Sequence, residues 1–465
     1  MIVPSNRLLF WVAMVILPFI LLAALVPPAA SLSIVIMALF TLAVLTDAAT
    51  VGRSLRGISI TPAPIARMSK DREGKIELRI RNERQTPKTI RLGLPLPGEI
   101  ESEHHDIRFE LEAGSEWSRV DWPCLPRRRG KYLVETIYLE GGSALGFWLW
   151  RRKQTMKSEV RVYPNLLTER KDLAAVFLNR GGVGLHAQRQ VGKGREFEKL
   201  REYIPGDGYD EVHWKATAKR GRPVTKVFQV ERTQEVYVII DASRLSARTV
   251  PASRVLATAL SPGGGRSLGA ETSLAQPTTI LERFITAALV LGLAAEKQGD
   301  LFGLLTFTDQ VKSFVRAKNG KAHFSSCRDA LYTLQPQIVT PDYDEVCTFI
   351  RLRLRHRALV IFLTSLDDAL LSESFVRNMD LLRHQHLVLV NMIQPSSVAP
   401  VFGNSNIVSM DDLYEHLGGH LLWQKLRELE KVLQRRGVRF SLLKNERLSA
   451  ELVSQYMNLK QRQLI

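Results

Sequence analysis

The chain has 465 residues, of which 45% are hydrophobic and 24% charged, and its formal net charge is +17 at pH 7. This composition excludes a disordered or fibrous chain, and the length predicts roughly two to four domains. The basic excess predicts an anionic partner, either a nucleic acid or an acidic membrane surface. Cys124, Cys327 and Cys347 form no CxxC pair, which argues against a disulfide scaffold or a zinc site and indicates a reducing compartment.

Two uncharged apolar runs, Leu8 to Val26 and Ala29 to Thr46, open the chain on either side of a Pro-Pro turn. Each is just long enough to cross a bilayer core, which takes about 20 apolar residues. A cleaved signal peptide is the alternative. Its apolar region is usually only about 7–15 residues long, and no second run follows it. We therefore expect a two-helix transmembrane hairpin within residues 1–56.

The basic residues around this hairpin predict its orientation. Arg7 precedes the first run, no Lys or Arg lies in the turn, and Arg53, Arg56, Arg67 and Lys70 follow the second run. Because cytoplasmic flanks carry the excess of Lys and Arg, both ends are expected on the cytoplasmic side. We predict a two-pass protein of the inner (cytoplasmic) membrane, with its soluble domains in the cytoplasm and an anionic membrane surface as a partner.

Residues 57–165 alternate apolar and polar side chains, as in the stretch GKIELRIRN from Gly74 to Asn82. A period of two indicates half-buried strands, and several such segments between Gly- and Pro-rich turns predict an antiparallel β-sandwich.

Residues 235–465 change to continuous apolar runs alternating with helical stretches. The runs are VYVIID (Val236 to Asp241), LFGLLTFT (Leu301 to Thr308), ALVIFLTS (Ala358 to Ser365) and LVLVNMI (Leu387 to Ile393). The helices are expected over Thr279 to Gly299, Asp342 to Arg357 and Leu417 to Gly437. This order predicts a doubly wound α/β domain with a parallel sheet, interrupted by a flexible Ser- and Gly-rich insertion at about 244–277. Ligands of such sheets bind at the carboxyl ends of the strands, where Asp241 and Ser365 lie.

The stretch IIDASRLS resembles the start of a von Willebrand factor A domain, whose metal site begins Asp-x-Ser-x-Ser. The resemblance assigns metal-site positions to five residues of this chain: Asp241, Ser243, Thr340, Ser365 and Asp367. Leu245 replaces the second serine, and Ser365 stands where the family has an aspartate. Because a hard cation prefers several oxygen ligands, we interpret this as a degenerate site that binds no metal, with Mg²⁺ binding as the alternative.

A second stretch, GREFEKLREYIPGDGYDEVHWKATAKRGRPVTKVFQVE from Gly194 to Glu231, resembles the signature of the family called domain of unknown function 58. That family combines an N-terminal transmembrane hairpin, a β-domain, this signature and an A-type domain, so the resemblance extends over nearly the whole chain. It implies a partner, an AAA+ ATPase of the MoxR type. It implies no settled activity.

The signature lies in a predicted connector segment, residues 166–234. We expect Asp210 to cap a short helix and Trp214 to anchor that helix as a buried side chain. A catalytic use of the segment would need a carboxylate and His213 to converge on one substrate atom, which the spacing does not require. The candidate residues are Arg195, Glu196, Arg201, Asp207, Asp210, His213, Trp214 and Lys215. The glycines of the segment match neither of the nucleotide-binding patterns GxxxxGK(S/T) and strand-GxGxxG-helix. We therefore interpret the segment as a structural connector.

We therefore predict a membrane-anchored interaction or assembly factor, non-catalytic, that works with a MoxR-type ATPase in maturation or quality control of envelope or enzyme complexes. One alternative is a hydrolase that uses the signature acids or a metal at the strand ends. A second is a binder of anionic surfaces, lipid or nucleic acid. The basic run from Arg351 to Arg357 lacks the interleaved aromatics of nucleic-acid binders, so no specific nucleic acid is expected. No cofactor is expected, and the sequence indicates no oligomeric state.

Overall fold

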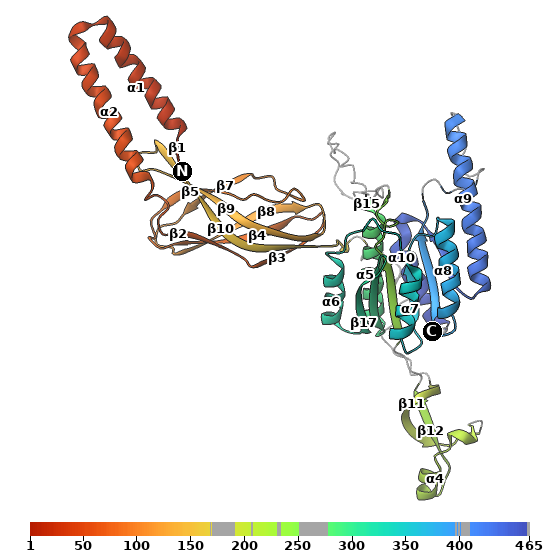
Figure 1. Ribbon diagram of the computed structural model, residues 1–465. Helices are drawn as coiled ribbons and strands as arrows, with labels where there is room; N and C mark the ends of the chain where they lie inside the picture. Colours follow the sequence, from red (N-terminus) through yellow and green to blue (C-terminus); the bar gives the residue numbers. More distant parts are fainter. Residues whose placement is uncertain are drawn as a thin grey trace, which may run out of the picture. The chain divides into compact units, whose positions relative to one another are not determined.

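The computed structural model describes residues 1–167, 169, 191–205, 208–229, 234–250, 278–395, 398, 400 and 410–462. The chain divides into two compact units, Met1–Asn165 and Leu166–Ile465 (Figure 1). Most of the expected insertion, residues 251–277, lies outside the described residues, as does Asp207 of the signature.

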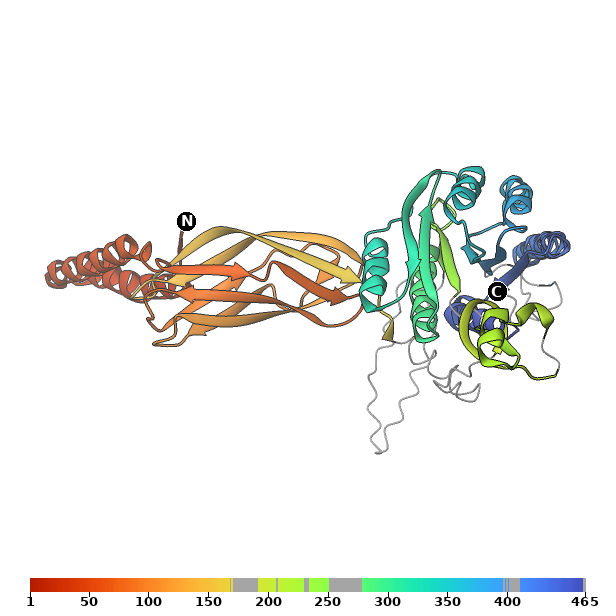
Figure 2. The same cartoon turned by 90° about the horizontal axis from the view of Figure 1, so that it is seen from below.

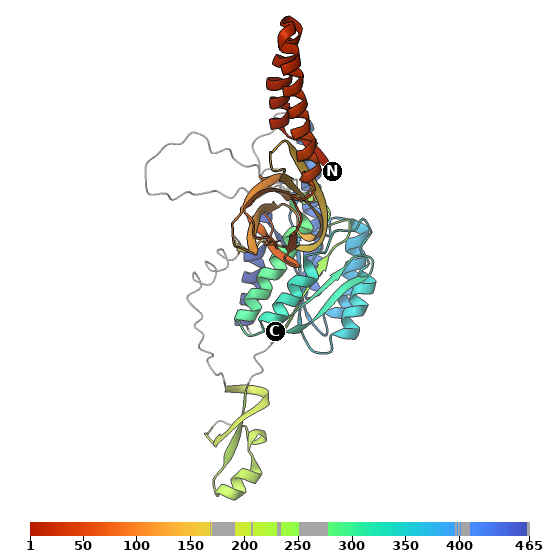
Figure 3. The same ribbon diagram turned by 90° about the vertical axis from the view of Figure 1, so that its left-hand side faces the viewer.

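Two long helices open the first unit and run side by side in opposite directions (Figures 1 and 3). They are α1 (Asn6–Leu25) and α2 (Ala30–Val51), joined by a short 3₁₀ turn, Pro27–Ala29. The Ser5 side chain begins α1 by accepting the backbone N–H of Leu8 at 3.3 Å. Both helices are long and apolar enough to cross a membrane and are almost wholly unburied, so they suggest a membrane anchor.

Two β-sheets that share one hydrophobic core form the rest of this unit (Figure 2). One contains β1 (Ile2–Pro4), β3 (Ile65–Ser69), β5 (Lys88–Gly93), β7 (Asp106–Leu111), β9 (Gly130–Gly142) and β10 (Trp148–Tyr163). The other contains β2 (Ile58–Pro62), β4 (Gly74–Asn82), β6 (Ile100–Glu101) and β8 (Trp117–Pro126). The predicted antiparallel strands are confirmed, with one departure, because β3 pairs with β10 in parallel.

The last turns of α2 are fixed to the turn between β9 and β10 by the Asp47 side chain. Its carboxylate accepts hydrogen bonds from the Ser143 hydroxyl at 2.5 Å and from the backbone N–H groups of Leu145 at 3.1 Å and Phe147 at 3.2 Å. The indole of Trp148 donates to the Val44 carbonyl at 3.0 Å. The base of the helical hairpin is therefore tied to the β-sheet by specific polar contacts.

A six-stranded sheet in the order β17-β16-β13-β18-β19-β20 is the centre of the second unit. The strands are β13 (Glu235–Asp241), β16 (Leu301–Phe307), β17 (Val311–Lys318), β18 (Leu359–Leu363), β19 (Leu387–Ile393) and β20 (Arg439–Leu443). All pair in parallel except β17, which is antiparallel to β16. The expectation of a wholly parallel sheet is thus wrong at this edge, because the short turn from β16 to β17 permits only an antiparallel return.

Helices cover both faces of this sheet. One face packs against α5 (Ile280–Lys297), α6 (Lys321–Leu331) and α10 (Leu448–Gln461). The other packs against α7 (Tyr343–Arg353), α8 (Ala369–Leu382) and α9 (Met410–Arg435). Helix α9 begins seven residues before the predicted Leu417. The sheet between these layers is buried on both sides, which explains its continuous apolar runs.

The signature forms a small module of its own elements. It contains β11 (Val191–Glu202), a 3₁₀ turn (Tyr209–Glu211), α4 (Trp214–Arg220) and β12 (Val224–Gln229). Strands β11 and β12 pair with each other in a two-stranded antiparallel sheet. Helix α4 ends at Gly221, whose φ of 66° is a left-handed conformation that glycine adopts without strain.

Candidate functional site

The carboxyl ends of β13, β16 and β18 meet at one edge of the parallel sheet, where the sequence predicted the site. Asp241 ends β13, which lies between β16 and β18. Backbone hydrogen bonds draw the loops together here: Ala242 N–H donates to the Phe307 carbonyl at 2.8 Å, and Arg244 N–H to the Val339 carbonyl at 3.0 Å. The loop after β13 therefore lies against both the end of β16 and the loop that leads into α7.

Asp241 organises the loop that follows it. Its Oδ1 accepts the backbone N–H of Ser243 at 2.8 Å, and the Ser243 hydroxyl in turn accepts the N–H of Leu245 at 3.3 Å. The Ser246 hydroxyl donates to the Ser243 carbonyl at 2.9 Å. Short polar side chains that bond to nearby backbone in this way specify a tight turn. Asp241 and Ser243, which the resemblance assigned to a metal site, thus act on the backbone of their own loop.

The second oxygen of Asp241 is bonded to a residue that sequence reasoning missed. Thr364, directly after β18, donates its hydroxyl to Oδ2 at 2.6 Å, and the Tyr343 hydroxyl lies 2.9 Å from the same threonine oxygen. All three side chains are essentially inaccessible to solvent. Burial raises the pKa of Asp241, while the hydrogen bonds from Thr364 and Ser243 oppose that rise. The only feature of the sequence that could have indicated Thr364 is that it directly precedes Ser365, a candidate residue of the metal site.

The other residues of the predicted metal site do not join this cluster. Ser365 is buried and Thr340 is exposed, and within the described part of the chain no hydrogen bond links either side chain to Asp241. Asp367 forms an ion pair with Arg248, and Asp368 pairs with Arg244 at 3.3 Å.

These contacts do not fit a hard cation. Both oxygens of Asp241 already accept protein donors, and the Asp367 and Asp368 carboxylates are compensated by guanidinium groups. Leu245, at the position of the family's second serine, is buried and offers no oxygen. A cation of this kind takes about six to eight oxygen ligands, most of which this edge does not supply. Among the described residues, no group of three or more His, Cys, Asp or Glu side chains is placed to hold a metal.

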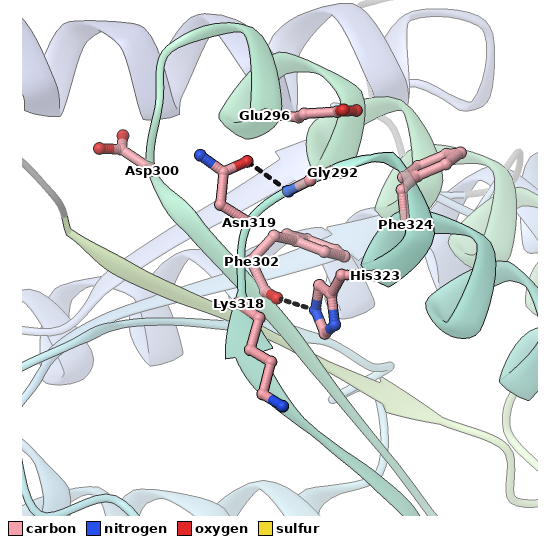
Figure 4. Close-up of a pocket in the computed structure, with 9 residues that line it drawn as sticks. Gly292, Glu296, Asp300, Phe302, Lys318, Asn319, His323 and Phe324 are labelled. Atoms are coloured by element: carbon pink, nitrogen blue, oxygen red, sulfur yellow. Dashed lines mark hydrogen bonds between the residues drawn. The ribbon is translucent and has the colours of Figure 1, made fainter.

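At the opposite edge of the sheet, where β16 begins, lies a small cavity (Figure 4). The His323 ring contacts the Phe302 carbonyl at 2.7 Å beside it. The volume of this cavity is about 10 Å³, which is room for a single water molecule, so the cavity is too small for a substrate.

The signature module corrects two expectations. His213, not Asp210, caps α4: its Nδ1 accepts the Ala216 N–H at 3.0 Å, because the helix begins at Trp214, four residues after Asp210. Trp214 is not a buried anchor, since 68% of it is exposed. The ring lies on the first residue of a seven-residue helix, whose described residues include no buried side chain.

The remaining signature residues lie apart from the Asp241 cluster in sequence. Arg195 and Glu196 belong to β11, but their side chains lie outside the described parts of the chain. Arg201 lies in β11 opposite Thr225, Asp210 lies in the 3₁₀ turn, and the Lys215 side chain is exposed on α4. The Nδ1 of His213 accepts a hydrogen bond as the helix cap, so this nitrogen is not available to act as a general base.

These features define an α/β protein in which the carboxylate that ends β13, Asp241, accepts protein donors on both oxygens. A family model described as "Protein of unknown function DUF58" matches residues 199–256 and 270–410, so the predicted resemblance is confirmed over these two segments. The resemblance to an A-type domain and the link to a MoxR-type ATPase stay predictions. No curated protein matches the chain.

Several solved structures are similar over about half of the chain. The conserved hypothetical protein BatB from Bacteroides thetaiotaomicron is 14% identical, with 49% of this chain and 99% of that one covered and a TM-score of 0.28. An uncharacterized membrane spanning protein from Vibrio fischeri is 14% identical, with 49% and 98% covered and a TM-score of 0.16. Proximal thread matrix protein 1 from the mussel byssus is 12% identical, with 48% and 46% covered and a TM-score of 0.24. At these scores the similarities carry no argument about function.

Proposed function

We propose that the protein is a membrane-anchored, non-catalytic interaction factor that binds a protein partner through its signature module. The carrying observation is a set of large apolar side chains that this module leaves exposed. Ile204 is 56% exposed, Trp214 68% and Tyr209 78%. Tryptophan and tyrosine are the side chains most enriched among residues that dominate binding energy in protein interfaces.

The strand-end site supports the same conclusion. Asp241 is buried and bonded on both oxygens, and Asp367 and Asp368 are paired with arginines. The hydrolase alternative needs an acid and a base free to converge on a substrate, and each of these carboxylates already contacts a donor of the protein itself. By the resemblance stated above, the partner is an AAA+ ATPase of the MoxR type, and the complex acts in maturation or quality control of envelope or enzyme complexes.

The proposed place of action is the inner membrane, with the soluble units in the cytoplasm. Helices α1 and α2 are the anchor, and the basic residues that flank them give the orientation. A reporter fused to the end of the chain should behave as cytoplasmic, and a periplasmic signal would reverse this assignment.

Crosslinking in intact membranes tests the interaction. The full chain should capture an AAA+ ATPase, and Trp214→Ala or Tyr209→Ala should lower the capture at least about 30-fold, the factor that corresponds to loss of a dominant interface residue. Leu370→Ala is the matched control, since Leu370 on α8 is 79% exposed and lies outside the module. Equal capture by Trp214→Ala and Leu370→Ala, or no captured ATPase, would overturn the proposal.

A further inference from the structure

A groove of about 1040 Å³ lies in the first unit, where α1 meets the β-sheet. Its wall is formed by the start of α1, by β5 and β7, and by the turn between β9 and β10. Every one of these segments belongs to the described part of the first unit.

The groove carries an excess of positive charge. Its lining contains five cations, Arg7, Lys88, Arg91, Arg108 and Arg151, against two carboxylates, Glu110 and Glu140. Glu140 is already shared by two of the cations, at 2.6 Å from Arg151 and 3.7 Å from Arg91. Arg91 has a further partner in Asp106.

Two of the lining cations form no ion pair within the described part of the chain, although Arg91 and, to a smaller extent, Arg108 lower the pKa of the Asp106 carboxyl. Among the described residues, no salt bridge engages Arg7 or Arg108. Lys88 donates to the Ser54 carbonyl, so its ammonium is held at the groove wall without neutralisation by a carboxylate. The groove therefore offers fixed positive charge that an anion can approach.

The exposed side chains of α1 indicate the depth of this groove relative to a bilayer. Leu8 is buried, but Leu9, Phe10 and Trp11 are 61%, 58% and 48% exposed, directly after Arg7. At 1.5 Å of rise per residue, Trp11 lies only about 6 Å further along the helix than Arg7. Because tryptophan is enriched where membrane meets water, an α1 that crosses the bilayer would place the groove at the level of the lipid headgroups.

We propose that this groove binds the phosphate headgroup of an anionic lipid from the bilayer around α1 and α2. The inference rests on the proposed membrane anchor. The shared chemistry is a phosphate ester held by arginine and lysine, which bind phosphate through charge-assisted hydrogen bonds. We assign it to a lipid rather than to a soluble phosphate because the exposed apolar surface of α1 begins directly beyond Arg7, where acyl chains can lie.

The test uses the full chain in nanodiscs of phosphatidylcholine and phosphatidylglycerol in equal amounts. Lipids retained after extraction are counted by native mass spectrometry. The wild-type chain should retain phosphatidylglycerol preferentially. Arg7→Gln with Arg108→Gln should lower this retention at least tenfold, since each cation near a membrane surface is worth about fivefold in affinity for anionic lipid.

Two control variants make the result specific. Arg72→Gln with Lys157→Gln removes the same charge from exposed positions that do not line the groove, and retention should stay at the wild-type level. Arg7→Lys with Arg108→Lys keeps the charge and should retain most of the lipid. The lysine variant replaces the same two side chains as the glutamine variant but keeps their charge. If it retains the lipid, the loss in the glutamine variant is a loss of binding and not of folding.

Three outcomes reject the inference in distinct ways, and a fourth bears only on the proposed protein partner. Equal losses in the groove variant and the Arg72, Lys157 variant would mean general attraction to the membrane and no specific site. Stabilisation by glycerol phosphate in lipid-free detergent, with no preference for phosphatidylglycerol, would mean a soluble ligand. Failure to enter nanodiscs at all would reject the anchor itself, whereas lipid binding without ATPase capture would reject only the proposed protein partner.

Discussion

Replacing Asp241 by alanine and by asparagine tests what this buried carboxylate does. The side chain is fully inaccessible, with Oδ1 bonded to the Ser243 N–H and Oδ2 to the Thr364 hydroxyl. Alanine removes both acceptors. Asparagine keeps an oxygen for Ser243 and can donate its amide to the Thr364 oxygen, so it retains both contacts without the charge.

The expected magnitudes follow from these contacts. A buried donor left without an acceptor costs about 1–3 kcal/mol. The Ser243 N–H loses its acceptor in the alanine variant, while the Thr364 hydroxyl can still bond to Tyr343. We therefore expect Asp241→Ala to lower the free energy of unfolding by about 1–3 kcal/mol and Asp241→Asn by no more than about 1 kcal/mol at neutral pH.

The pH dependence gives the sign of the charge effect. Burial raises the pKa of Asp241 in the folded chain above the value of about 3.9 in the unfolded chain. The folded state therefore binds the proton more tightly, and the stability that this binding provides is complete below about pH 4 and is lost as pH rises through the folded pKa. Since asparagine does not titrate, its stability relative to the wild type should improve over the same range of pH.

Amide exchange in β13 of the full chain measures both effects, because this strand lies in the middle of the sheet. The alanine variant should exchange faster and the asparagine variant should not. Added Mg²⁺ should leave wild-type exchange unchanged. If Asp241→Asn is as damaging as alanine, or if Mg²⁺ protects only the wild type, the carboxylate is needed as an anion and the reasoning about internal satisfaction fails.

His213→Ala should lower the stability of the signature module by about 1 kcal/mol in urea unfolding, while His213→Asn should restore the cap; normal unfolding with loss of cellular function in both variants would favour a catalytic imidazole. Trp214→Ala should change stability by less than about 1 kcal/mol because the side chain is mostly exposed, and a loss of several kcal/mol would contradict the described exposure. Asp47→Ala should cost about 2–4 kcal/mol because a hydroxyl and two amides lose their acceptor; unchanged amide exchange in the β9–β10 turn would refute this. Burial raises the pKa of Cys124 to about 11 and that of Cys327 to about 12, so the folded chain should resist alkylation at pH 8 and react only when denatured, and rapid alkylation of the folded chain would count against their burial.

The strands of the parallel sheet could be predicted where both faces are buried. The runs at β13, β16, β18 and β19 are continuous in apolar residues because helices cover the sheet on both sides. The two edge strands, β17 and β20, were not predicted because they lack such continuous apolar runs. Each has polar residues within it, VKSFVRAK in β17 and RFSLL in β20, since an edge is partly exposed to solvent.

The site was predictable only as far as local sequence determines it. Asp241 and Ser243 lie two residues apart in one loop, so their contact follows from the end of a single strand. Thr364 reaches Asp241 because β18 pairs with β13 in a register that sets Leu363 opposite Ile240. This register could not be predicted from the single sequence. The resemblance to a metal site pointed instead to the neighbouring residue, Ser365.

Trp214 shows a different limit. A large aromatic in a charged segment is usually a packing residue, and that expectation holds only where enough surrounding structure exists to cover it. The signature module consists of a hairpin, one 3₁₀ turn and a seven-residue helix. Its exposed aromatics are the surface on which the proposed partner binding rests.

The net charge of +17 could not by itself distinguish among nucleic acid, membrane and solvent, because it gives no positions. Much of the positive charge on the β-sheets is compensated locally, as in the pairs of Lys75 with Asp121 and Arg151 with Glu140. Among the residues that the structure describes, Arg7 and Arg108 form no ion pair, and both line the same groove. They come together because β1 pairs with β10, which places the start of α1 beside a sheet formed mostly from later residues. This concentration of charge beside the start of two apolar helices is why we propose a bilayer lipid, and not a nucleic acid, as the anion.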